Sequence, residues 1–150
     1  MDSYEQYEQD CKRIRKDNKK ILNEFENWLS DKDLSKKTIA NHCNNMDFYI
    51  NNFLLYEEAI EAADGVYEID YFLGYWFIRK AMWSSKSSIK SNATSIKKFY
   101  EFMLEKGNID EEAYIELKEE IKNNMQSWLD TMERYDDPEI EDVEDIWGLN

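Results

Sequence analysis

Residues that interrupt regular structure are scarce in this chain, which has four glycines and one proline among 150 residues. An all-β protein needs many turns rich in these residues, so their scarcity favours long helices and an all-α fold. Apolar residues recur at helical spacing. We expect a compact bundle of four to five main helices, at about Tyr4–Ser30, Lys36–Leu54, Asp70–Met82, Lys86–Lys106 and Asp110–Arg134, with a short extra helix at about Tyr56–Ala63.

Two of the expected helix starts resemble each other across fifty residues. The segment LSKKTI (Leu34–Ile39) is echoed by SSKSSI (Ser84–Ile89), and Ser35 and Ser85 are suitable N-caps. The apolar positions continue the match, with Ile39, Cys43, Met46, Tyr49, Ile50 and Phe53 corresponding to Ile89, Ala93, Ile96, Phe99, Tyr100 and Met103. At about 100° per residue each set falls on one arc of its helix, so we expect both arcs to face the core.

The charge of the chain is unevenly distributed. Residues 71–100 contain six cations and no acid, and residues 34–46 contain two lysines and no acid. These two windows contribute +8 to a net charge of −14, which leaves −22 for the remainder. Exposed charges are screened over about 10 Å at 0.1 M salt, so a local basic face can act despite acids elsewhere.

The outer faces of the two echoed helices are rich in hydrogen-bond donors. Lysine, serine and threonine at a helix start can bind phosphates, and the helix dipole adds to the attraction. Asn41, Asn44 and Asn92 are of a type that reads adenine edges in a major groove. The competing interpretation is that these polar residues only solvate the surface.

Groups suited to catalysis or metal binding are few. The single histidine, His42, lies three residues from the core position Ile39, which favours a partly buried structural role. His42 and Cys43 are adjacent and cannot point at one metal on a regular helix, and Cys43 lies on the apolar stripe as a small core residue. There is no glycine-rich phosphate loop. We therefore expect no enzyme activity and no cofactor.

The ends of the chain differ from its centre. We divide it into a charged helical extension (1–20), a helical core (21–109), an acidic helix packed on that core (110–135) and an acidic tail (136–150), which we expect to be disordered or loosely docked. The tail could dock on a basic protein partner or fold over the protein's own lysines. No apolar run approaches the roughly 18 residues that span a membrane, and no signal core begins the chain, so we expect a cytoplasmic protein without membrane contact.

The stretch Ile21–Ile109 resembles the N-terminal core-binding (SAM-like) domain of tyrosine recombinases, the phage-integrase family. The matching stretches are ILNEFENWL, LSKKTIANH, IDYFLGYWF and SSKSSIKSNATSIKKFYEFMLEKGNI. The resemblance implies a helical bundle that grips duplex DNA as one half of a clamp, with the second and fourth main helices toward the major groove. It also implies a role in DNA recombination and integration by a mobile element.

Carried over by position, the resemblance implies DNA contacts from Ser35, Lys37, Thr38, Asn41, Lys86, Ser88, Lys90, Ser91, Asn92, Lys97 and Lys98. His42 stands where the family has a tyrosine, and Asn92 stands where an arginine is common. The family's catalytic domain has no counterpart after Ile109. The leading hypothesis is a non-catalytic DNA-binding module, an accessory or decayed recombinase; the alternative is a helical protein-interaction module that has lost DNA binding.

Overall fold

The computed structural model describes residues 2–148, and within them the chain is all-helical with no strand. The long helices are α1 (Ser3–Ser30), α2 (Lys36–Asp47), α5 (Lys86–Glu105) and α6 (Glu111–Asp136). The short segments are α-helical α3 (Ile69–Tyr71), α4 (Phe77–Lys80) and α7 (Val143–Ile146), π-helical η1 (Phe48–Phe53) and η3 (Phe72–Trp76), and 3-10-helical η2 (Asp64–Tyr67). The expected all-α class is confirmed.

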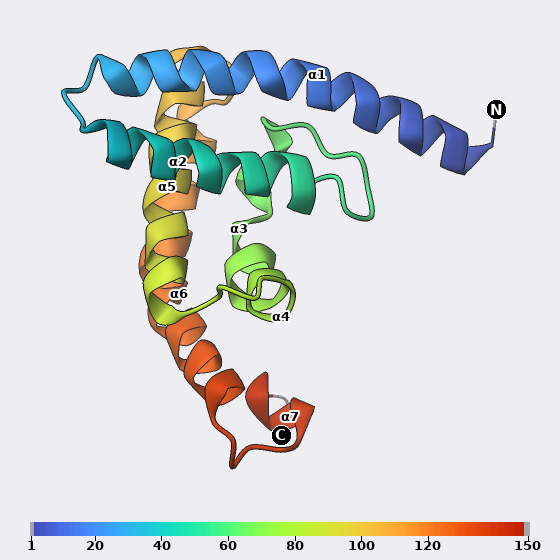
Figure 1. Ribbon diagram of the computed structural model, residues 1–150, viewed down its shortest axis with the longest axis vertical. Coiled ribbons are helices and arrows are strands. Elements are labelled where there is room, and N and C mark those ends of the chain that lie inside the picture. Colours follow the sequence, from blue (N-terminus) through green and yellow to red (C-terminus); the bar gives the residue numbers. More distant parts are fainter. Residues whose placement is uncertain (1, 149–150) are drawn as a thin grey trace.

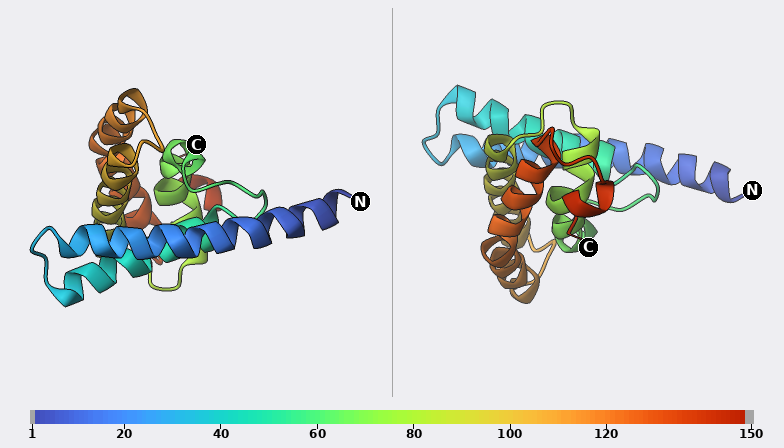
Figure 2. Two further views of the ribbon diagram at one scale, coloured as in Figure 1. Left: turned by 90° about the horizontal axis from the view of Figure 1, so that it is seen from above. Right: turned by 90° about the horizontal axis from the view of Figure 1, so that it is seen from below.

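The long helices form two pairs that cross. Helices α1 and α2 run side by side across the α5–α6 pair, as Figure 1 shows, and Figure 2 shows the same crossing from above and below. The continuous stretch α3–η3–α4 packs beside α6, and residues 54–63 form a loop under the projecting N-terminal half of α1 (Figure 1). We call this segment the 54–63 loop. This arrangement leaves one face of both α2 and α5 open.

One hydrophobic core joins all the long helices. Phe25 of α1 packs edge-on against Phe99 of α5, with ring centroids 5.2 Å apart. On α6, Trp128 is buried and its indole N–H donates to Asp70 Oδ1 at 2.8 Å. The acidic helix α6 is therefore part of the same core as the echoed helices, since Leu117 is buried in that core as well.

Two buried tyrosines bind the same turn from different helices. Tyr49 donates to the Gly65 carbonyl at 2.6 Å, and Tyr100 donates to the Ala62 carbonyl at 2.8 Å. A Cβ at Gly65 would lie 2.6 Å from both the Tyr100 hydroxyl and a Leu54 methyl, so only glycine fits there. Burial raises the pKa of both tyrosines well above the ordinary value, so both remain donors.

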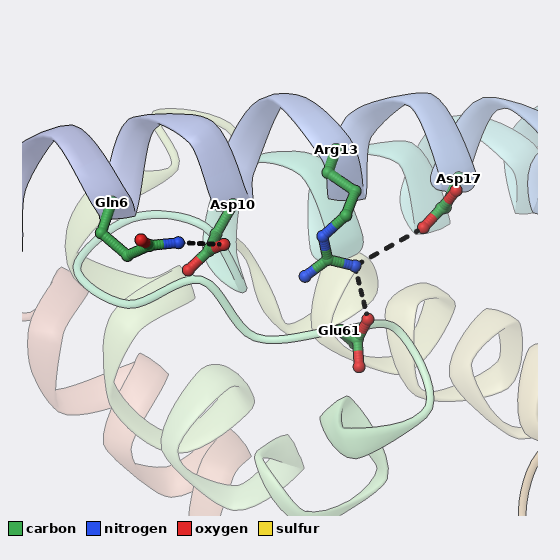
Figure 3. A network of polar contacts seen from close by, with 5 residues as sticks. All are labelled: Gln6, Asp10, Arg13, Asp17 and Glu61. Atoms are coloured by element: carbon green, nitrogen blue, oxygen red, sulfur yellow. Dashed lines mark hydrogen bonds and ion pairs between the residues drawn. The ribbon is translucent and has the colours of Figure 1, made fainter. Parts of the chain in front are cut away.

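The N-terminal half of α1 extends beyond the main core but is tied to the 54–63 loop. Arg13 binds Glu61 at 3.0 Å and Asp17 at 3.8 Å, next to a hydrogen bond from Gln6 to Asp10 (Figure 3). Tyr7 donates to the carbonyls of Leu55 and Tyr56. Beneath these contacts, a second small hydrophobic cluster forms from Cys11, Ile14 and Leu55.

The prediction of a short helix at Tyr56–Ala63 is wrong. The 54–63 loop is not helical, and the helical turn follows it as η2. The physical reason lies in the carbonyls that a helix would need. The Leu55 and Tyr56 carbonyls accept from the Tyr7 hydroxyl, and the Leu54 carbonyl accepts from the Ile60 backbone N–H, so the local helical hydrogen bonds are replaced.

The other expected helices are found within about two residues of their predicted ends, but two of them change type. The second continues from α2 into the π-helical η1, where Leu54 N–H donates to the Tyr49 carbonyl. The third contains the π-helical η3 between α3 and α4. The two π-helical segments pack together through aromatic rings, including Phe53 and Phe72 at 4.8 Å.

The acidic tail contacts α6 and η3 through Ile146 and Trp147. Arg134 Nε donates to the Ile146 carbonyl at 2.8 Å, and the Trp147 ring lies 4.7 Å from Tyr75 and 6.4 Å from Tyr135. Of the two states expected for the tail, residues 143–148 adopt the docked one, while residues 149 and 150 lie outside the described part.

Candidate nucleic-acid interface

The contact between α2 and α5 brings the two echoed helices together. Asn45 Nδ2 donates to Ser91 Oγ at 3.2 Å and to Ser95 Oγ at 2.9 Å. His42 Nδ1 lies 2.7 Å from the same Ser95 hydroxyl. These polar contacts place the side of α2 around Asn45 against the side of α5 around Ser91.

Serine and threonine at the two helix starts are already used by caps. The Ser35 hydroxyl accepts from the Thr38 backbone N–H at 3.1 Å. On α5, Ser85 and Ser88 form a reciprocal capping box, with N–H to Oγ distances of 3.0 and 2.8 Å. Ser35, Thr38 and Ser88, which the resemblance assigns to DNA, therefore have local structural roles that hold the helix starts.

Asn92 does not lie on the outer face. Its side chain is 2% exposed, and its amide donates to the Ser88 carbonyl one turn earlier at 2.8 Å. Ser95 is fully buried, and its hydroxyl contacts His42 and Asn45 of α2. Asn92 therefore cannot touch a ligand at this face. At about 100° per residue it lies inside the apolar arc of α5, between Phe99 and Met103, at the position equivalent to the buried His42.

The lysines of the predicted contact set fall into two groups. Lys86 pairs with Glu133 of α6 at 3.2 Å, so an acid lies next to this lysine. Both side chains are at least half exposed, and ion pairs of this kind contribute little to the free energy of folding. Within residues 2–148, no ion pair is formed by Lys37, Lys90, Lys97 or Lys98.

Six of the predicted residues remain available at this face and define what we call the α2–α5 surface: Lys37, Asn41, Lys90, Ser91, Lys97 and Lys98. Lys97 and Lys98 are half-buried, and the other four are exposed. The surface has four cations, and its acid-free character comes from the two windows in which it lies. It can offer ammonium groups to anionic oxygens and an amide to a hydrogen-bonding edge.

His42 has the structural position that its sequence context predicts. It is 8% exposed and sits between α2 and α5. Burial lowers the pKa of His42, and the nearby charge of Lys98 lowers it further. The ring is therefore neutral at pH 7 and serves the helix contact.

Cys43 is less buried than expected, since it is only half-buried against α1. Burial, with a smaller effect from Glu26, raises the pKa of the Cys43 thiol to about 11. The thiol is therefore protonated at neutral pH and is a poor nucleophile. Across residues 2–148, no cluster of three or more His, Cys, Asp or Glu side chains could hold a metal ion, and no helix is long and apolar enough to cross a membrane.

Sequence reasoning missed the side chains around the start of α5. Asn45 of α2, which joins that helix to Ser91, was not recognised from the sequence. In the loop before α5, Met82 is 98% exposed and Trp83 is 57% exposed. The available signal was a pair of bulky apolar residues that is separated from the N-cap Ser85 by Ser84 alone, in a place where a polar loop is usual.

Comparison with protein-family models, curated proteins and solved structures gave no match. The likeness to integrase core-binding domains therefore rests on the sequence motifs alone.

Proposed function

We propose that this protein is a non-catalytic module that binds double-stranded DNA through the α2–α5 surface. The observation that carries the proposal is the Asn45 bridge to Ser91 and Ser95, because it joins two acid-free helix faces into one surface. Lys37, Lys90, Lys97 and Lys98 would neutralise phosphates. Asn41, exposed on α2, would face base edges or sugar.

The overall negative charge does not exclude this role. At 0.1 M salt, charges farther than about 10 Å are largely screened, so the local lysines dominate at the surface. Acids elsewhere would repel DNA approaching other faces and so restrict binding to one orientation. The expected affinity is modest and falls steeply with salt.

The test is fluorescence anisotropy with a labelled duplex over a range of salt concentrations. Binding should give a log–log slope of about −3 to −6, since each neutralised phosphate contributes about −0.9. The triple variant Lys90→Gln/Lys97→Gln/Lys98→Gln should weaken binding more than about tenfold and reduce the slope by about 2 to 3. Absence of binding at low salt would overturn the proposal.

A matched control carries the same change of charge elsewhere. Lys12→Gln/Lys16→Gln/Lys19→Gln alters three exposed lysines on the projecting half of α1. This control should keep binding within about threefold of wild type, because only long-range attraction changes. Equal loss in both triple variants would mean non-specific attraction and would count against the α2–α5 surface.

The second candidate function is a helical protein-interaction module. It is favoured by the −22 carried outside the two windows and by the Lys86–Glu133 pair, which places an acid at the edge of the α2–α5 surface. A tail that inhibits DNA binding would have to leave its contacts with Tyr75 and Tyr135. No duplex binding by the full chain or by a chain lacking residues 136–150 would favour this second function.

A further inference from the structure

A hollow of about 180 Å³ opens where η1, the 54–63 loop and the stretch from Glu68 through α3 and η3 meet. Its walls contain four aromatic residues, Phe53, Tyr56, Tyr71 and Trp76. The rings form one connected group, with centroid distances of 5.1 Å for Phe53–Trp76, 5.5 Å for Tyr56–Trp76 and 6.0 Å for Phe53–Tyr71. We call it the aromatic hollow, and it contains none of the residues of the α2–α5 surface.

Three glutamates also line the aromatic hollow: Glu57, Glu58 and Glu68. Among residues 2–148, no cation forms an ion pair with any of them. Glu57 and Glu58 are exposed, and Glu68 is half-buried. The faces of aromatic rings carry partial negative charge, so the rings and the carboxylates both favour a cation at this place.

The protein's own lysine shows how this aromatic wall meets an ammonium group. Lys80 Nζ lies 5.1 Å from the centroid of the Tyr56 ring and donates to the Tyr56 hydroxyl at 3.1 Å. Lys80 lines a neighbouring hollow that shares Tyr56 and Trp76 with the aromatic hollow. The carboxylates lie only on the aromatic hollow, so it has the negative charge that the neighbouring one lacks.

The size of the aromatic hollow limits its ligand. Sites for small molecules usually have about 300–1,000 Å³, whereas a cavity of about 150 Å³ can hold a benzene ring. About 180 Å³ therefore suits the end of one side chain and is small for a whole metabolite. Leu54 and Ile60 add apolar lining that suits the methylene stem of a lysine.

We propose that the aromatic hollow binds an alkylammonium group, presented as a lysine side chain by a protein partner. The partner is a basic peptide segment, attracted by the three carboxylates of the hollow and held against its four rings. This interaction is independent of DNA binding, since it uses a separate set of residues.

The probe is a capped glycine–serine peptide with a single central lysine, titrated into the full chain. The indole N–H resonances of the protein are followed by NMR, and the Trp76 signal is assigned from a Trp76→Phe variant. Trp76 lines the aromatic hollow, so its indole resonance reports on changes at this wall. The lysine peptide should shift the Trp76 resonance in a saturable way. A control peptide with norleucine, which lacks the charge, in place of the lysine should bind at least about fivefold more weakly.

Variants locate the binding to the aromatic hollow. Glu57→Gln/Glu58→Gln and, separately, Tyr71→Leu should each weaken binding of the lysine peptide about fivefold or more. These side chains are at least half exposed or lie in a loop, and far-ultraviolet circular dichroism checks the fold. The control Glu139→Gln/Glu141→Gln removes the same charge from the tail and should change affinity less than about twofold.

Each opposite result overturns the proposal. Equal affinity for lysine and norleucine peptides would show that the charge is not recognised. Equal loss in the control would show only general attraction to an acidic protein. If free butylamine binds as tightly as the lysine peptide, the occupant is a free amine and no protein partner is needed. Duplex binding is measured separately on the same variants, so its failure and the failure of this proposal are distinguishable.

Discussion

Helices α2 and α5 begin with similar sequences, yet they reach the core in different ways. Helix α5 stays regular for 20 residues, while α2 ends after 12 and continues as the π-helical η1. At equivalent positions, His42 reaches across to Ser95 of the other helix, whereas Asn92 bonds to the Ser88 carbonyl of its own helix. The shared apolar spacing sets which arc of each helix is buried. The type of polar residue at equivalent positions sets whether its side chain contacts the other helix or its own.

The two helices also converge on one turn. Tyr49 of η1 corresponds to Phe99 in the echo, and Tyr100 of α5 is the next residue. Tyr49 donates to the Gly65 carbonyl and Tyr100 donates to the Ala62 carbonyl. The turn is therefore fixed by two helices that lie far apart in the sequence. A change in either helix reaches the same part of the molecule, so the two helices can be compared by substituting matched positions.

Truncation of matched core positions should have the largest effect. Met46 and Ile96 are both fully buried, so Met46→Ala and Ile96→Ala should each lower the free energy of unfolding by about 2–5 kcal/mol. Urea unfolding measures the loss, with the exposed Asn44→Ala and Thr94→Ala as controls within about 0.5 kcal/mol. A cost below about 1 kcal/mol at Met46 alone would mean that the neighbouring π-helical turn adapts to the cavity.

Removal of the matched caps should have an intermediate effect. Ser35→Ala and Ser85→Ala should each cost about 1 kcal/mol, because a backbone N–H in the first turn loses its acceptor. The loss should be greater at Ser85, because this cap is half-buried whereas Ser35 is exposed, so water replaces the lost acceptor less readily. Thermal unfolding compares the two, and an equal or greater loss at Ser35 would contradict the ranking.

The matched polar positions, His42 and Asn92, should have the smallest effect, which is a pH dependence of the free energy of unfolding. The folded protein holds the pKa of His42 below its ordinary 6.5, so the unfolded chain takes up the proton first as the pH falls. This contribution to stability is complete above about pH 6.5 and is lost as the pH falls toward the folded pKa. Asn92 does not titrate.

The measurement is the urea midpoint of wild type and of His42→Asn at several pH values. The difference between the two proteins should be constant above about pH 6.5 and should shrink below it. Lys98→Gln should make the wild-type dependence shallower, because the charge of Lys98 helps to lower the pKa of His42. A difference that grows as the pH falls would show that His42 is protonated in the folded state.

Most of the fold could be predicted from the sequence because its helices carry strong local signals. The caps at Ser35, Ser85 and Asp110 and the apolar spacing place the long helices. The 54–63 loop could not be predicted, because its non-helical shape depends on Tyr7, about fifty residues away. The π-helical segments likewise depend on the packing of Phe53 against Phe72 rather than on local propensity.

The candidate site was predictable only in part. Charge distribution identified Lys37, Lys90, Lys97 and Lys98, because the absence of acids is visible in the sequence. The burial of Asn92 could have been predicted as well, since at about 100° per residue it lies between Phe99 and Met103 inside the apolar arc, but the resemblance placed it at the DNA by position. The aromatic hollow was missed entirely, because its walls come from three segments that only the folded chain brings together.

The separate small cluster of Cys11, Ile14 and Leu55 gives the N-terminal half of α1 a stability of its own. The N-terminal half of α1 is attached to the rest of the protein by a few contacts with the 54–63 loop, including Arg13–Glu61. The second half of α1 packs in the main core. This half can therefore open and close many times during the lifetime of the folded core. Its amides should exchange with solvent first, and a protease should cut there before it can reach any other long helix.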